Sequence, residues 1–329
     1  MKTLLFSLGL LIFLFICCKK DKTDNIPNNP TQTTGTVFVA DHTVAQESVL
    51  RLIPKKYIFR ARKTLHIAYQ HTSHGTHITY GLFGLPNYKA GDDTLFAITN
   101  NGNSVNGKLD FHDFALASSA PLNVDASDLS VDETAFIQTT RNFLDKSENA
   151  DINVVMWSWC SITGHKVSTN YIPGMQTLIS EYGTGGSKIG TGSGKRLNAV
   201  TFIFMTGHAE KNSNIGGGKP KNQSDTILNF CKKNKYYCLD YYNIDTHDMS
   251  NNYWEDAGDD GNSDIGGNFY LTWQNSHSKG IDWYENRSSP GGSVAFGQHN
   301  TQHITANRKA YAMWYILARI AGWDGESTN

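Results

Sequence analysis

The chain has 329 residues and a formal net charge of -1, with 39% hydrophobic and 18% charged residues. No basic stretch alternates with aromatic residues, so a nucleic-acid partner is not expected. Beyond the N-terminal leader, the three cysteines Cys160, Cys231 and Cys238 are an odd number and do not form a disulfide framework. The remaining length suits a single α/β domain with insertions.

The N-terminus has the pattern of an export signal. Lys2 precedes the apolar run LLFSLGLLIFLFI, which is short for a membrane-spanning helix. The run ends at Cys17 and Cys18 and is followed by KKDKTDN, which is typical of a bacterial lipoprotein signal with Cys18 as the lipidated residue. Lipidation at Cys17, an ordinary secretory signal and an uncleaved anchor are the alternatives. We therefore expect a signal peptide over 1–18, a flexible tether over 19–40, and an extracytoplasmic protein held to the outer membrane, on its periplasmic or its surface face, by the lipid alone.

Short apolar runs alternate with segments of helical period in the rest of the chain. Strands are predicted at 64–70, 152–159, 199–207 and 236–242, and helices at 131–149, 171–183, 223–235 and 303–323. This alternation predicts an α/β fold with a doubly wound, mainly parallel sheet of about five strands, flavodoxin-like in type, with 64–70 central. We expect one domain over 41–325. Segments 85–130 and 246–297, rich in Gly, Asn, Asp and aromatic residues, are interpreted as insertions over one end of the sheet.

Polar residues gather where the predicted strands end. Ligands of open parallel sheets bind outside the carboxyl ends of the strands, so these residues predict a functional cleft. They are His71, Ser73, His74 and His77 after the first strand, Ser158 after the second, His208 and Glu210 after the third, Asp245 after the fourth, and His299 and His303 before the last helix.

The positions of a serine and a histidine in this layout resemble the SGNH/GDSL hydrolase superfamily. Ser73 in HTSHG stands where that family has its nucleophile, and His303 in NTQHITAN stands where it has its base. The resemblance spans residues 64–323 and rests on layout. Asn300 and Thr72 stand where the family has aspartates, and WSWCSIT occupies the place of the block with the oxyanion asparagine. The resemblance implies an SGNH-hydrolase-like fold and a serine esterase.

The acyl-transfer hypothesis assigns Ser73 as nucleophile and His303 as general base, with no cofactor. Asn300 takes the orienting position but carries no negative charge, so Asp245, Glu210 or a backbone carbonyl orients the imidazole in its place. The residues expected to line the pocket or the oxyanion site are His71, His74, Ser158, His208, Glu210, Asp245 and His299. A tethered extracytoplasmic esterase suggests an acylated carbohydrate, or another small ester, as substrate.

Two other hypotheses remain open. A metal-dependent hydrolase would hold a divalent ion at His71, His74 and His208, although neither a His-Glu-x-x-His motif nor a cysteine-pair signature is present. The acidic stretch 255–264 lacks EF-hand spacing and is interpreted as a solvated loop. A non-catalytic glycan-binding lipoprotein would use the aromatic residues of the late insertion, such as Trp254, Trp273 and Trp283, for stacking on sugar rings.

Overall fold

A six-stranded parallel sheet forms the centre of the fold in the computed structural model, which describes residues 38–326. The predicted signal with Cys18, and the tether as far as residue 37, lie outside the described residues. The strands are β1 (Val39–Ala40), β2 (His66–Gln70), β3 (Asp110–Asp113), β4 (Val154–Trp157), β5 (Thr201–Met205) and β6 (Cys238–Leu239). Their order is β1-β6-β5-β4-β2-β3, and every pairing is parallel.

The five strands β2 to β6 have the strand order of a flavodoxin-like sheet. Counted along the chain from β2, the order across the sheet is 2-1-3-4-5, and β1 is added beside β6. The topological switch point therefore lies between β2 and β4, where crossovers depart in opposite directions. The predicted doubly wound α/β fold is confirmed.

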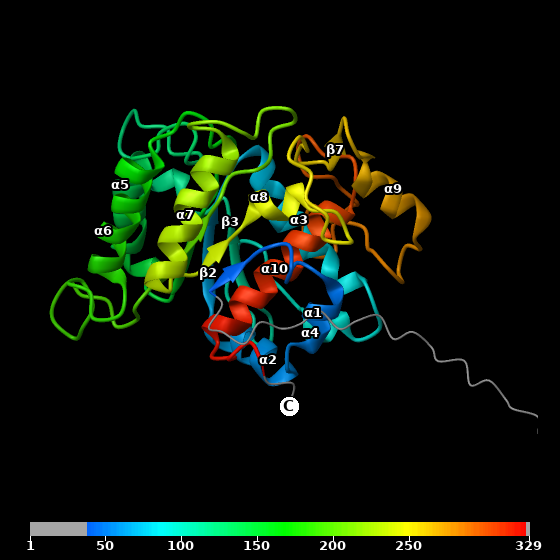
Figure 1. The fold of residues 1–329 in the computed structure, drawn as a ribbon. Helices are drawn as coiled ribbons and strands as arrows, with labels where there is room; N and C mark the ends of the chain where they lie inside the picture. Colours follow the sequence, from blue (N-terminus) through cyan, green and yellow to red (C-terminus); the bar gives the residue numbers. More distant parts are fainter. Residues whose placement is uncertain (1–37, 327–329) are drawn as a thin grey trace, which may run out of the picture. The chain divides into compact units, whose positions relative to one another are not determined.

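Helices cover both faces of this sheet (Figure 1). On one face lie α1 (Glu47–Leu52), α2 (Lys55–Thr64), α3 (Thr76–Gly84) and α10 (Ile304–Ile320), and on the other α5 (Ala135–Leu144), α6 (Ile172–Tyr182) and α7 (Pro220–Asn234). The strands supply both cores by alternation: Ile67 and Met156 join the core on the α10 face, whereas Ala68 and Val155 join the other. Burial on both faces explains why these strands are continuous apolar runs in the sequence.

Shorter elements complete the described chain. They are α4 (Asp92–Leu95), α8 (Tyr241–Thr246), α9 (Phe269–Ser276), the antiparallel pair β7 (Asn262–Ser263) and β8 (Gly267–Asn268), the 3₁₀ turns η1 (Ser73–Gly75), η2 (Leu85–Asn87), η3 (Ala117–Ser119) and η4 (Ser147–Asn149), and the π-helical turn η5 (Val167–Tyr171). The late insertion has a small apolar core of its own around Phe269 and Tyr270, against which Trp254, Trp273 and Trp283 pack half-buried. No helix within residues 38–326 is long and apolar enough to cross a membrane.

Three details of the predicted organisation are wrong. The segment 85–130 is not wholly an insertion, because it contains β3, and β3 makes β2 the second strand from the edge instead of a central one. Its sequence DFHD has no apolar run, since an edge strand has fewer neighbours and here its acidic side chains bind histidines of β2 and of the turn after it. The last residues of the predicted tether 19–40 form β1, which pairs with β6.

Candidate functional site

The turn that follows β2 brings Ser73 to the switch point. Ser73 has a φ of 35°, a left-handed backbone conformation that is uncommon for a residue other than glycine, and α3 begins three residues later. The turn packs tightly on the neighbouring strands: a Cβ at Gly75 would lie 2.3 Å from Cβ of His71 and 2.6 Å from Oγ of Ser158. Glycine at position 75 is thus required for the close approach that fixes the position of Ser73.

Three imidazoles from different segments stack beside this turn, and we call them the imidazole stack: His74, His208 and His299. The ring of His74 lies 3.6 Å from that of His208, which follows β5, at an interplanar angle of 10°. On the same ring stacks His299, from the loop before α10, at 4.8 Å. His299 is exposed and also has a left-handed φ, of 65°. Cys160, after β4, places its Sγ 3.6 Å from Nδ1 of His74.

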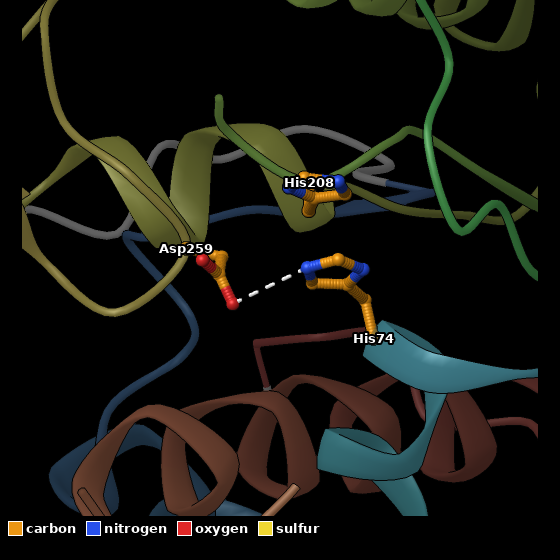
Figure 2. A group of neighbouring side chains, drawn as sticks. All are labelled: His74, His208 and Asp259. Carbon is orange, nitrogen blue, oxygen red and sulfur yellow. Dashed lines mark ion pairs between the residues drawn. The ribbon is translucent and has the colours of Figure 1, made fainter. Parts of the chain in front are cut away.

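Asp259 projects from the late insertion toward the stack (Figure 2). Its Oδ2 lies 3.5 Å from Nε2 of His74 and 4.0 Å from Nε2 of His77. This oxygen is buried and has no hydrogen-bond partner among the described residues. One potential ligand atom from each of His74, His208 and Asp259 lies within 4.8 Å of the other two. The three side chains therefore form a compact group of two imidazoles and one carboxylate.

Burial sets the protonation states of this group. Desolvation, followed by the neighbouring histidines, lowers the pKa of His74 to about 2, and desolvation lowers the pKa of His208 to about 4. Both rings are therefore neutral at pH 7 and keep a lone pair. Desolvation, reinforced by the charge of Asp245, raises the pKa of Asp259 well above its ordinary value. Burial thus disfavours the charged forms of His74, His208 and Asp259 unless an opposite charge lies beside them.

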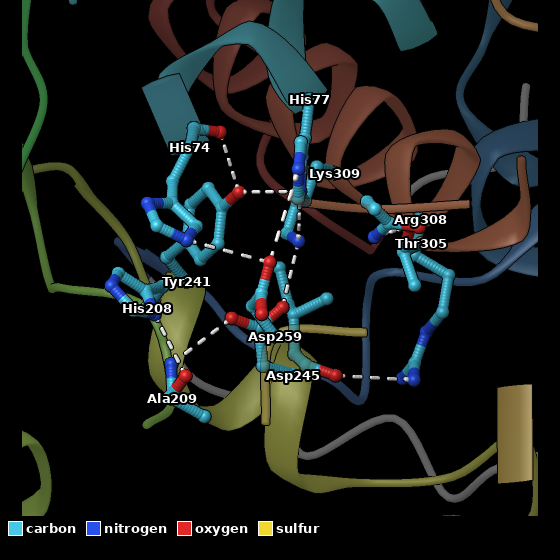
Figure 3. A network of polar contacts seen from close by, with 12 residues as sticks. His74, His77, His208, Ala209, Tyr241, Asp245, Asp259, Thr305, Arg308 and Lys309 are labelled. Atoms are coloured by element: carbon cyan, nitrogen blue, oxygen red, sulfur yellow. Dashed lines mark hydrogen bonds and ion pairs between the residues drawn. The ribbon is translucent and has the colours of Figure 1, made fainter. Parts of the chain in front are cut away.

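A buried ion pair lies beneath the group (Figure 3). Nζ of Lys309, on α10, is 2.7 Å from Oδ1 of Asp245, and both side chains are fully buried. The same ammonium lies 3.1 Å from Nδ1 of His77 and 3.9 Å from the ring centroid of Tyr241. The Tyr241 hydroxyl donates to the backbone carbonyl of His74 at 2.7 Å. This network connects α3, α8 and α10 and holds the backbone of the site in place.

The structure places the predicted base, His303, in a different environment. Its Nδ1 accepts a hydrogen bond from the backbone N–H of Asn286 at 3.1 Å, and its ring stacks with Phe296 and with Trp283. Among the described residues no hydrogen bond joins it to Ser73. Asn300 does not orient it, because the Asn300 amide donates to Thr305 and its carbonyl oxygen accepts from the backbone of Gln302.

The other predicted pocket residues divide into two sets. His74, His208 and His299 converge, and Asp245 lies just below them, where its Oδ2 accepts from the backbone N–H of Ala209. Ser158 is fully buried under the turn, and Glu210 accepts a hydrogen bond from Ser161. His71, a ligand in the metal hypothesis, lies outside the compact group of His74, His208 and Asp259. His71 is fully buried and directs Nε2 at Asp113, 2.7 Å away, because β3 brings this carboxylate alongside β2.

Several residues of the site were not found from the sequence. Asp259 lies in the acidic stretch 255–264, for which the lack of EF-hand spacing predicts a solvated loop, and its tertiary neighbours are not visible in the sequence. Lys309 occupies a fully buried position of α10, and a lysine within an amphipathic helix ordinarily indicates the solvated face. Cys160 enters the sequence analysis only as one of three cysteines that form no disulfide framework. The position of Cys160 after a predicted strand was the one sequence feature that could have indicated a role in the site. No sequence feature indicated such a role for Lys309.

Comparisons with protein-family models, with curated proteins and with solved structures find no match to this chain.

Proposed function

We propose that the chain is a hydrolase of carboxylic esters in which Ser73 is the nucleophile. The observation that carries the proposal is the strained conformation of Ser73 on a strand–turn–helix at the switch point. A left-handed non-glycine residue costs about 1 kcal/mol or more, and such residues concentrate at functional sites. The same geometry exposes the nucleophile of other serine hydrolases and places backbone N–H groups of the turn next to it, where they can stabilise an oxyanion.

We propose His299, in place of His303, as the proton acceptor. His299 is exposed and stacks on His74, the residue next to Ser73, whereas Nδ1 of His303 is occupied by a backbone N–H. In the proposed reaction, Oγ of Ser73 attacks the carbonyl carbon while its proton passes to His299. The imidazolium then protonates the leaving alcohol, and water hydrolyses the acyl-serine by the reverse sequence. The resemblance to the SGNH/GDSL hydrolase superfamily in the position of the serine supports Ser73 as the nucleophile.

The proposed substrate is an acylated carbohydrate or a similar small ester. Phe296 lies three residues before His299, is 46% exposed, and stacks with the ring of His303. An apolar ring face therefore lies in the same loop as the proposed base. Flat aromatic faces of this kind suit the apolar faces of sugar rings. If the intact protein binds glycans but cleaves no ester, the chain is a binding protein and the catalytic proposal is wrong.

A short-chain aryl ester and a panel of acetylated sugars provide the test. We expect Ser73→Ala to lower kcat by about 1,000-fold or more, and His299→Ala to lower it to a similar extent, because nucleophile and base act as a unit. Ser161→Ala is the matched control, since this serine lies in the loop after β4 and hydrogen-bonds to Glu210. Undiminished turnover by Ser73→Ala contradicts the proposal. A loss in His303→Ala with full activity in His299→Ala would return the base to His303.

We also propose that the protein is a lipoprotein acting outside the cytoplasm, which the apolar leader ending at Cys18 supports. Cys18→Ala should leave the chain unlipidated and release it from the membrane fraction. Retention of this variant with membranes at the level of the parent protein would contradict the lipid anchor.

A further inference from the structure

We propose that His74, His208 and Asp259 bind one divalent transition-metal ion of the zinc type. The proposal concerns binding and does not depend on the esterase assignment. The set differs in one ligand from the site that the sequence suggested, since the carboxylate of Asp259 takes the place of the His71 imidazole.

The donor set is the first argument. Two imidazoles and one carboxylate are the protein ligands of many catalytic zinc sites, which keep a fourth position open. Zinc-to-ligand distances of about 2.1 Å put tetrahedral ligand atoms about 3.4 Å apart. His74 and Asp259 already have atoms 3.5 Å apart, and all three ligand atoms lie within 4.8 Å. Side-chain rotations that tilt the two stacked rings toward a common point and move the ligand atoms by about 1 Å would complete the geometry. Calcium and magnesium are disfavoured, because they select oxygen ligands.

The charge balance around Asp259 is the second argument. Its buried Oδ2 accepts no hydrogen bond among the described residues, and its nearest ring nitrogens belong to His74 and His77. Lys309 is the nearby buried cation, but its ammonium is in direct contact with Asp245. A buried carboxylate without a hydrogen bond or a paired charge is costly. A divalent cation between Asp259 and the two imidazoles supplies the missing partner.

The surroundings of the ligands are the third argument. Metal-binding histidines are ordinarily held by a hydrogen bond to a carbonyl or carboxylate. Nδ1 of His208 lies 2.7 Å from the carbonyl oxygen of Ala209, and Asp245 in turn accepts the N–H of Ala209. Tyr241 fixes the backbone carbonyl of His74. Across residues 38–326, no other set of three His, Cys, Asp or Glu side chains brings its ligand atoms this close together.

A bound ion would lie next to the turn that carries Ser73. There it would supply positive charge for a substrate carbonyl or a bound water. The site would then combine an activated oxygen nucleophile with a Lewis acid. Metal binding and ester cleavage can be separated experimentally, because Ser73 is not among the proposed ligands.

The test is a titration of the chelator-treated and dialysed full chain with Zn²⁺ by calorimetry, and with Co²⁺ by visible absorption. We expect one ion per chain and a cobalt spectrum of tetrahedral type. His74→Ala, His208→Ala and Asp259→Asn should each weaken binding by about 100-fold or more. Asp110→Asn is the matched control, because Asp110 also lies between two histidines but is hydrogen-bonded by both. Ser73→Ala should bind metal as the parent protein does.

Asp259→Asn keeps the shape of the side chain, so it decides the question even if a histidine variant fails to fold. Parent protein that takes up no ion, or Asp259→Asn that binds as tightly as the parent, would overturn the proposal. An equal loss in Asp110→Asn would also overturn it, because it would indicate adventitious binding to surface histidines. Metal binding that persists while every ester is left uncleaved would sustain this site and reject the esterase.

Discussion

An aspartate lies beside two histidines at each end of β2, but the two aspartates differ in whether their oxygens are hydrogen-bonded. At the amino end, Asp110 lies between two histidines and both of its oxygens are used. Nδ1 of His66 is 2.7 Å from Oδ2, and Nε2 of His112 is 3.1 Å from Oδ1. The sheet register places His66 of β2 directly beside Asp110 of β3, and His112 lies two residues after Asp110 on β3. Both imidazoles are about a quarter exposed, so water can satisfy the rest of each ring.

At the carboxyl end, Asp259 also lies beside two histidines, but its buried oxygen has no hydrogen bond. The pKa values move in opposite directions. Burial tends to raise the pKa of Asp110, but hydrogen bonds from His112 and His66 outweigh it and lower the pKa. At Asp259, burial dominates and raises the pKa. Composition therefore does not distinguish a structural cluster from a binding site, whereas unmet hydrogen-bonding and charge requirements do.

The largest effect is expected for the ion pair beneath the carboxyl-end group. Lys309→Met removes the partner of a fully buried carboxylate and should lower the free energy of unfolding by about 4 kcal/mol. Urea denaturation followed by circular dichroism measures it. The double variant Lys309→Met, Asp245→Asn should recover part of the loss, because it leaves no unpaired charge. A Lys309→Met protein as stable as the parent would show that the ion pair does not hold this end together.

The close packing of the turn is the next difference between the two regions. Gly75→Ala forces a methyl group into contact with His71, Ser158 and Tyr69, and should cost about 3 kcal/mol. Gly102→Ala is the control, because a Cβ at Gly102 meets no atom within 4 Å. The two variants can be compared by thermal and chemical unfolding. Equal stability of both would mean that the turn can relax, and that Gly75 does not fix Ser73.

Acid should destabilise the folded chain through His303, which lies outside the carboxyl-end group. Desolvation lowers the pKa of His303 from its ordinary value of 6.5 to about 4. Between these values the unfolded chain binds a proton that the folded chain does not, so this contribution to stability is present above pH 6.5 and is lost as the pH falls toward 4. Between pH 7 and pH 5 the loss is about 2 kcal/mol. His303→Gln should flatten the stability profile by this amount in urea titrations at several pH values. An unchanged profile would place the acid sensitivity elsewhere.

The smallest effect is a change in the free energy of unfolding that should have opposite signs for the Asp259→Asn and Asp110→Asn variants. Without metal, Asp259→Asn removes an unpaired buried carboxylate and should raise the free energy of unfolding by about 1 kcal/mol. Asp110→Asn removes a carboxylate that is bound by two imidazoles and should lower it by about 1 kcal/mol. Both are measured by urea denaturation in the presence of a chelator. A destabilising Asp259→Asn would mean that the carboxylate is already satisfied, and the contrast between the two ends of β2 would disappear.

The sheet could be predicted because its signal is local. Continuous apolar runs such as 152–159 and 199–207 are what a strand buried on both faces requires, and helical segments between them require parallel crossovers. β3 escaped prediction because its acidic residues are satisfied by histidines from β2 and the turn after it, a pairing that becomes visible only once the strands are adjacent. β1 escaped because two residues cannot establish a period.

The sequence by itself determined the fold class, the edge of the sheet at which polar residues gather, and the position of Ser73 after the strand now labelled β2. The physical reason is that hydrophobic periodicity and chain order suffice to place strand ends along one edge. Only the tertiary structure decided which polar side chains meet: Asp259 with His74 and His208, His71 with Asp113, and His303 with Asn286. These pairings depend on the paths of the loops and on the burial of single atoms, and neither produces a periodic pattern in the sequence.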